Sequence, residues 1–282
     1  MARTAIVTDS AGDLPPDVAA TASITVVPLT VSFGAEEFRA GVDLSMADFY
    51  ARLTAPGAAF PKTAACSPGD FQRAFEAAFE AGNDAVVCIT VGSRLSATHR
   101  SAELARDALP SRDVHVIDSQ TASLGEGLLA LLGAEMATRG DEPAAIAEAI
   151  RRRVADIRVV FALDTLEYLR RGGRISGAQA AIGSVLSVKP IITIADGVVE
   201  TLDKPRTRTR ARERLLQMLT HLPAERAWIL HSGVDDIEPF AEGVAVSLGL
   251  PRSAIPVSLM GPSIAPHVGP GGVGAAVLTR VT

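Results

Sequence analysis

The chain has 282 residues, of which 48% are hydrophobic and 21% charged, and its formal net charge is -5 at pH 7. This composition is typical of a folded globular protein with one large or two ordinary domains. The acidic balance argues against nucleic acid as a partner, since nucleic-acid-binding domains are normally basic. Aromatic residues make up only 4% of the chain, so the core must be largely aliphatic.

No targeting, membrane or metal signal stands out. The N-terminus reaches Asp9 too soon to hold the apolar region of a signal peptide. The apolar run 127–134 is far too short to span a membrane. Cys66 and Cys88 are the only cysteines, and the five histidines lack metal-ligand spacing. We therefore expect a cytoplasmic protein without a metal, a cofactor or stable membrane insertion.

The first half of the sequence alternates between strands and helices, which predicts a parallel sheet with helices on both faces. A segment at 34–61, with a short helix around 46–53, departs from this alternation. Strands are expected at 4–8, 24–33 with an interruption at Pro28, 85–90 and 114–117. Helices are expected after Pro15 with Asp13 as the cap, from Ser67 through Phe79, and at 96–108, 124–138 and 143–154.

The pattern changes after a strand at 157–162. Asp196-Gly197 separates two apolar runs, which is a strong signal for a β-hairpin. A hairpin mixed with helical crossovers predicts a mixed sheet. The expected fold is therefore α/β with two domains, an N-terminal parallel α/β/α domain at 1–160 and a C-terminal α+β domain at 161–282. The remaining helices are expected at 207–221 and 237–247, and the remaining strands at 227–230 and 255–259.

The stretch 164–189 contains a short helix that ends at Gly172-Gly173, with Arg170 and Arg171 in its last turn. Arg174 follows the break, and Ser176 is expected to cap a second helix running to residue 181. Arginines beside a broken turn and a helix start are suited to holding an anion. The alternative is a structural corner with solvated arginines.

Several other polar positions allow more than one interpretation. Asp9-Ser10 and Asp118-Ser119 end predicted strands, where parallel sheets bind ligands, although an acid there more commonly caps a helix or loop. Thr63 lies in the expected loop before the helix at Ser67, and Ser96 begins the next predicted helix. Hydroxyls at helix starts can hold a carboxylate or phosphate, or simply cap.

Two features near the C-terminal end complete the candidate positions. His267 lies in a proline- and glycine-rich loop and is not expected in a regular element. The GxGxxG pattern at 269–274 has too few residues after it for a dinucleotide-binding crossover. We interpret it as a turn where the backbone passes close to another group.

A set of motifs runs in a fixed order along essentially the whole chain. They are IVTDSAGDLP (6–15), KTAACSPGDF (62–71), GSRLSATHRSA (92–102), VIDSQTASLGEGLL (116–129), LDTLEYLRRGGRISGAQAAIGSVLSVKPII (163–192) and PHVGPGGVG (266–274). Together they resemble the DegV family, the fatty-acid-binding subunits of the bacterial fatty acid kinase system.

The resemblance implies that a long-chain fatty acid such as palmitate lies in a tunnel between the two domains. Thr63 and Ser96 would hold its carboxylate, with His267 close by. The sequence departs from the usual family pattern at Ala64-Ala65-Cys66, where Ser-Gln-Pro is common, and at Arg94 and Ala97, where glycines are common. These departures leave the width of the pocket and its chain-length preference open.

The resemblance also implies a partner. A separate ATP-dependent kinase subunit would phosphorylate the bound acid to an acyl phosphate, so this chain would be an acyl carrier without catalysis of its own. Arg171, Arg174 and Arg206 would face the kinase or the nascent phosphate. We expect Arg174→Ala to preserve fatty acid binding and to impair phosphorylation.

Two functions from other classes compete with this interpretation. A serine hydrolase acting on a lipid or ester would use Ser96 as nucleophile, His267 as base and Asp9 or Asp118 as the orienting acid. Its weakness is the absence of a GxSxG elbow motif. A binder of small phosphorylated ligands, or a kinase-like domain, would also suit two α/β domains with an anion-binding corner.

Overall fold

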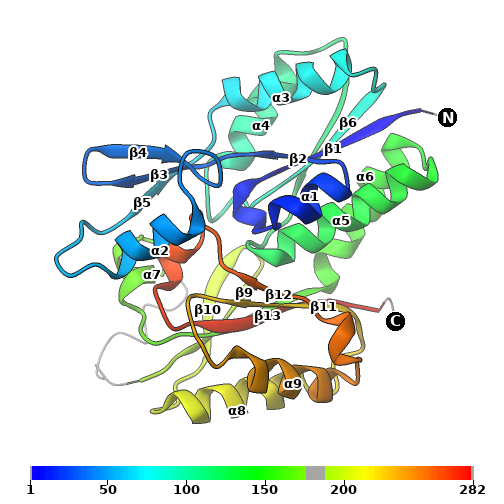
Figure 1. Cartoon of the computed structure of the whole chain (residues 1–282). Coiled ribbons are helices and arrows are strands. Elements are labelled where there is room, and N and C mark those ends of the chain that lie inside the picture. The colour runs from blue at the N-terminus through cyan, green and yellow to red at the C-terminus, as the bar shows by residue number, and fades with distance from the viewer. Residues whose placement is uncertain (1, 176–187, 281–282) are drawn as a thin grey trace.

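A computed structural model describes residues 2–175 and 188–280 of the chain. Two main sheets and one small sheet, with helices between and outside them, make up this part of the protein (Figure 1). The mixed α/β architecture predicted from the sequence is confirmed. The helix expected at 176–181, with Ser176 as its cap, lies outside the described residues.

The first sheet is entirely parallel and has the strand order β2-β1-β6-β7. Its central strand β6 is a continuous apolar run in which all six residues are buried, as expected where helices cover both faces. The strands are β1 (Thr4–Asp9), β2 (Ile24–Val27), β6 (Ala85–Thr90) and β7 (Asp113–Asp118). The helices that cover it are α3 (Pro68–Glu80) and α4 (Thr98–Asp107) on one face, and α5 (Leu124–Arg139) and α6 (Pro143–Arg153) on the other.

The predicted start of one helix agrees with the structure, whereas the predicted cap of another does not. Ser67 and Asp70 form the expected capping box at the start of α3. The expected cap of α1 (Pro16–Thr21) is wrong, because Asp13 adopts a left-handed backbone conformation before the helix begins. Its buried carboxylate instead accepts hydrogen bonds from the Ser123 hydroxyl and the Gly261 amide.

The second sheet is mixed and has the strand order β10-β9-β8-β13-β11-β12. Its expected hairpin is confirmed, because β9 and β10 pair antiparallel across Asp196-Gly197. The strands are β8 (Ile157–Ala162), β9 (Ile191–Ala195), β10 (Val198–Asp203), β11 (Ala224–His231), β12 (Val257–Leu259) and β13 (Val273–Thr279). The helices on its outer face are α8 (Arg208–Leu219) and α9 (Ile237–Leu248).

Strand β13 was not predicted, although it lies at the centre of this sheet and all seven of its residues are buried. It pairs antiparallel with β8 on one side and with β11 on the other. The expected domain boundary after residue 160 falls inside β8, which pairs with β13 from Ile157 through Ala162. The whole of β8 therefore belongs to the mixed sheet.

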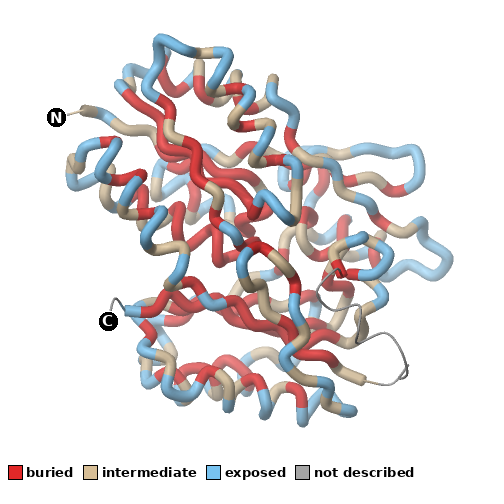
Figure 2. Tube along the Cα trace, turned by 180° about the vertical axis from the view of Figure 1, so that it is seen from behind, coloured by how far each residue is buried: buried red, intermediate tan, exposed pale blue. Residues whose placement is uncertain are grey.

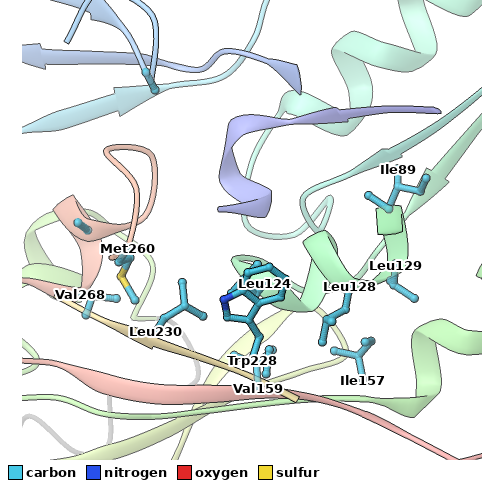
Figure 3. Close-up of a cluster of buried hydrophobic side chains, with 14 of the residues drawn as sticks. Ile89, Leu124, Leu128, Leu129, Ile157, Val159, Trp228, Leu230, Met260 and Val268 are labelled. Atoms are coloured by element: carbon cyan, nitrogen blue, oxygen red, sulfur yellow. The ribbon is translucent and has the colours of Figure 1, made fainter. Parts of the chain in front are cut away.

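Helix α5 lies between the two main sheets, so the protein is layered as helices, sheet, helices, sheet, helices (Figure 1). Burial is concentrated along the strands and on the helix sides that face them (Figure 2). Leu124 and Leu128 of α5 extend toward Trp228 and Val159 of the mixed sheet (Figure 3). A single hydrophobic cluster therefore joins the two sheets through α5.

The segment that interrupts the early βα alternation forms a small antiparallel sheet beside the main layers, with the order β4-β3-β5. The strand expected at 24–33 divides at Pro28 into β2 and β3, which belong to different sheets. The elements here are β3 (Thr30–Phe33), β4 (Glu36–Arg39), α2 (Met46–Thr54) and β5 (Lys62–Ala64). Two further short helices, α7 (Glu167–Arg171) and α10 (Ala265–Val268), contact each other.

Candidate functional site

A cavity lies between the first sheet, the small sheet and the inner face of the mixed sheet. Its empty volume is about 770 Å³, including the part open to solvent. Most of its wall is aliphatic, and seven of its lining residues are polar. The apolar wall consists of Ala11, Leu29, Ala64, Ala65, Val91, Leu95, Ala122, Val159, Phe161, Leu169, Ile192, Ile194, Val199, Ile264 and Val268.

The polar wall of the cavity contains Thr63, Ser96, His267 and Arg174, which come from four separate parts of the chain. The side chains of Thr63 and His267 are in direct contact, with 2.9 Å between Oγ1 and Nε2. Four candidate residues chosen from the sequence thus lie around one space.

The other two candidate arginines do not line this cavity. Arg171 lies on the surface with its guanidinium over the Phe60 ring, 4.1 Å from the ring centroid. Arg206 is exposed just before α8. Both remain available to a partner, but neither is placed to contact a ligand inside the cavity.

Thr63 lies in a strand and not in the loop expected from the sequence. It is the middle residue of β5, and it pairs with Val31 of β3. The tertiary pairing with β3 extends this short polar stretch, which has no apolar alternation of its own. A residue fixed in a sheet offers its hydroxyl from a more defined position than a loop residue does.

Ser96 lies two residues before α4, whose first residue is Thr98, so the expectation that Ser96 starts the helix is also wrong. Its Oγ accepts a hydrogen bond from the Thr98 amide at 3.2 Å and lies 2.9 Å from the Thr98 hydroxyl. The loop that carries it is fixed to the first sheet, because Asp118 accepts hydrogen bonds from the amide and hydroxyl of Ser93.

His267 lies within α10, whereas the sequence predicted a position outside regular structure. Burial, together with the nearby charge of Arg174, lowers the pKa of its imidazole to about 4. The ring is therefore neutral at pH 7. Its Nδ1 is buried and has no hydrogen-bond partner among the described residues, so Nε2 carries its one polar contact in the site, to Thr63.

The His267 imidazole leaves no room for a side chain at Gly172. A Cβ on Gly172 would lie 2.3 Å from Nδ1 of His267, closer than any real contact. Gly172 ends helix α7, as predicted, and Gly173 follows with a positive φ of 72°. The glycine pair therefore has two roles, because it ends α7 and also lets α7 approach the histidine.

Arg174 adds a positive charge to the polar part of the cavity. Its Nε donates to the Leu95 carbonyl at 3.1 Å, and its Nη1 donates to the Gly172 carbonyl at 2.6 Å. The guanidinium is thus held between the loop before α4 and the end of α7. This geometry places a fixed cation near Thr63, Ser96 and His267.

A layer of buried carboxyl groups lies beneath the cavity, and its central member, Glu126, was missed from the sequence. Asp9 accepts hydrogen bonds from the amides of Ala11 and Val91, both of which belong to cavity-lining residues. Glu126 accepts from the Thr8 hydroxyl at 2.8 Å. Burial raises the pKa of Asp9 to about 6 and that of Glu126 well above its usual range.

The acids at the strand ends therefore hold loops in place, as in the capping interpretation. Asp9 caps the short 3-10 helix Ser10–Gly12, and Asp118 accepts hydrogen bonds from Ser93 and from the Gln120 amide. Neither carboxylate is hydrogen-bonded to His267 in the described chain. The orienting acid that a serine hydrolase requires is thus missing from these residues.

Residues 2–175 and 188–280 contain no group of three or more metal-ligating side chains. In the same ranges, every helix is either too short or too polar to cross a bilayer.

Residues 3–280 match the profile of the DegV family, which is described as a family of uncharacterised proteins. The chain belongs to the DegV family. A DegV domain-containing protein of Caldanaerobacter subterraneus subsp. tengcongensis is 35% identical over 283 aligned residues, which cover 97% of this chain and 98% of the relative.

Solved structures of DegV proteins from other bacteria share the fold. A Thermus thermophilus family member, described in connection with fatty acid binding, has 36% identity and a TM-score of 0.90, covering 99% of this chain and 100% of that protein. DegV of Bacillus subtilis, described as a fatty acid binding protein, has 30% identity and a TM-score of 0.86 over 99% and 100% of the two chains. A stearic-acid-binding protein of Eubacterium ventriosum has 28% identity and a TM-score of 0.88 over 99% and 98%.

Proposed function

We propose that this protein binds one long-chain fatty acid in the cavity between its sheets and presents the carboxylate to a separate ATP-dependent kinase. The observation that carries the proposal is a largely aliphatic cavity whose few polar groups include the Thr63–His267 pair. DegV proteins with closely similar structures are described as fatty acid binders.

The apolar wall supplies most of the binding energy in this proposal. Each methylene moved from water into an apolar site contributes about 0.8 kcal/mol. Loss of translational and rotational freedom on binding offsets roughly 4–15 kcal/mol of the free energy gained by burying the methylenes. The contacts of the head group therefore decide whether a fatty acid binds tightly enough to be carried.

The polar wall is suited to a carboxylate. Thr63 and Ser96 bear hydroxyl donors, and neutral His267 contacts the Thr63 hydroxyl. Arg174 supplies the positive charge that a carboxylate removed from water requires, so Arg174→Ala should weaken palmitate binding, contrary to the expectation from the sequence that binding is preserved. We propose that Thr63 and Ser96 bind the carboxylate, with His267 and Arg174 beside it.

Lipid extraction tests the fatty acid proposal. The purified protein should yield long-chain fatty acid by mass spectrometry, and protein stripped of lipid should bind added palmitate. Protein that is recovered empty and does not bind palmitate would refute the proposal. A fluorophosphonate probe should leave Ser96 unlabelled, since neither Asp9 nor Asp118 is hydrogen-bonded to His267; labelling would instead favour a serine hydrolase.

Thr63→Val should weaken palmitate binding about 10- to 150-fold, because one hydrogen bond to a charged ligand contributes about 1.5–3 kcal/mol. Valine has nearly the shape of threonine and favours strands, so β5 should remain intact. Thr201→Val in β10 is the matched control, because Thr201 is half-buried and does not line the cavity. Equal affinity of the two variants in calorimetric titrations with palmitate would exclude Thr63 from the carboxylate site.

We propose that the kinase contacts the exposed cations outside the cavity, Arg171 and Arg206. Arg206→Ala should leave palmitate affinity unchanged and reduce the kcat/KM for acyl phosphate formation at least about threefold, as expected for a charge at an interface rim. Arg152→Ala, which removes an exposed arginine paired with Glu148 on α6, is the control. An unchanged rate for Arg206→Ala, measured with ATP and the kinase, would remove Arg206 from the interface.

A further inference from the structure

The loop that carries Ser96 is fastened to the mixed sheet by a side chain that the family resemblance does not predict. Arg94 occupies a position where glycine is expected from that resemblance. Its Nη1 donates a hydrogen bond to the carbonyl of Asp196 at 3.1 Å. Asp196 lies at the turn between β9 and β10, so this bond joins two segments 102 residues apart in the sequence.

The aliphatic part of the Arg94 side chain packs against the turn between β9 and β10. Asp196 and Gly197 have φ values of 49° and 72°, which are typical of a tight type I′ hairpin turn. A Cβ on Gly197 would lie 3.4 Å from Cβ, 3.5 Å from Cδ and 3.6 Å from Cγ of Arg94. The aliphatic stem of Arg94 therefore lies directly across the turn, and its guanidinium reaches the carbonyl beyond.

A second arginine also bonds to this loop. Arg174, which follows α7, donates from Nε to the Leu95 carbonyl. The two neighbours of this carbonyl in the sequence are Arg94, which reaches out to the hairpin, and Ser96, which lines the cavity. Residues 94–96 are thus bonded to two separate segments beyond the first sheet.

The hairpin reached by Arg94 forms part of the cavity wall. Ile194 of β9 and Val199 of β10 line the cavity on either side of the turn, and Leu95 and Ser96 line it from the loop. If the loop and the hairpin separate, the wall opens between these residues. The Arg94–Asp196 hydrogen bond links the two parts of the wall directly.

We propose that Arg94 is a positioning residue that holds the Ser96 loop against the β9–β10 hairpin and thereby slows the release of bound fatty acid. This inference rests on the proposed function. Arg94 is exposed and does not line the cavity, so it acts through the loop and not by contact with the ligand.

Release of cis-parinaric acid, a fluorescent fatty acid, to excess albumin tests the inference in stopped-flow measurements. Arg94→Gly should release the probe about fivefold faster, because an exposed hydrogen bond contributes about 1 kcal/mol. Arg94→Met, which keeps an apolar stem but lacks the donor, should release it nearly as fast. Arg94→Lys, which retains a donor, should restore most of the slow release. Arg100→Met is the matched control, because the Arg100 side chain pairs with Glu103 on its own helix.

The melting temperatures of the lipid-free variants separate a positioning role from a general loss of stability. The melting temperatures should stay close to that of the wild-type protein. Release of the probe should be fastest for Arg94→Gly, nearly as fast for Arg94→Met and slowest for Arg94→Lys. Equal release rates for wild type, Arg94→Gly and Arg94→Met would overturn the role of Arg94 while leaving fatty acid binding intact. Failure of the wild-type protein to bind the probe would instead refute the proposed function, and the role of Arg94 with it.

Discussion

Single polar residues hold together the loops around the cavity. Asp9 bonds to the backbone of two cavity-lining residues, Ala11 and Val91. Asp13 bonds both to Ser123, before α5, and to Gly261, which follows β12 of the mixed sheet. One carboxyl group thus links segments associated with the two main sheets. A buried acid in such a position couples the stability of the protein to its protonation state.

We predict that Asp13→Asn flattens the pH dependence of stability. Burial raises the pKa of Asp13 from 3.8 to about 7, so the folded protein retains a proton that the unfolded chain loses. The stability contributed by this proton is fully present below pH 3.8 and is lost as pH rises to about 7. Its contribution to the free energy of unfolding should fall by at most about 1.4 kcal/mol per pH unit in this window.

Urea unfolding at several pH values measures this effect. The asparagine variant should lose less stability than the wild-type protein between pH 5 and pH 7, and Asp17→Asn, a change at an exposed carboxyl of α1, should follow the wild-type slope. Parallel curves for Asp13→Asn and wild type would show that the buried acid does not titrate in this range.

The candidate site could be chosen from the sequence, but its local structure could not. Thr63, Ser96, His267 and Arg174 were chosen, mainly through the family resemblance, and they surround one cavity. Their expected local contexts were wrong for Thr63, Ser96 and His267, because contacts distant in sequence place these residues. Glu126 was missed because an acid in the first turn of a helix usually indicates only a favourable interaction with the helix dipole.

At the scale of elements, the contact between α7 and α10 positions the histidine of the site. Both helices are very short, with five and four residues, so tertiary contacts must supply most of their stability. Their approach depends on Gly172, whose missing side chain leaves room for the imidazole.

We predict that Gly172→Ala weakens palmitate binding about tenfold. The backbone of Gly172, with φ of -76° and ψ of -7°, accepts alanine without strain. The added methyl group would instead displace His267 from Thr63. The loss of binding free energy should be about 1.4 kcal/mol, which is the contribution of one hydrogen bond.

Gly173→Ala provides a matched control, because it should affect stability and not palmitate affinity. Its φ of 72° disfavours alanine, but nothing lies within 4 Å of the added Cβ. It should therefore lower the melting temperature while retaining palmitate affinity. If both variants bind palmitate as the wild type does, the approach of α7 to His267 is not needed for binding.

At the scale of the whole molecule, the pattern of hydrophobic residues along the sequence predicted the α/β class and most of the helices and strands. The alternation of strands and helices gave the parallel sheet, and Asp196-Gly197 gave the hairpin. Strand β13 was missed because its sequence, VGAAVLT, has two alanines and a glycine, which are weak strand formers. Its conformation is imposed by β8 and β11, which pair with it on either side.

The position of β13 also determines the order in which the mixed sheet can be completed during synthesis. Strands β8, β9 and β10 emerge from the ribosome before β11 and β12, yet β13 alone joins these two groups. Until Val273–Thr279 has been translated, β8 and β11 have no strand between them. The nascent chain must therefore keep two partial sheets, each with an open edge, until its last central strand is available.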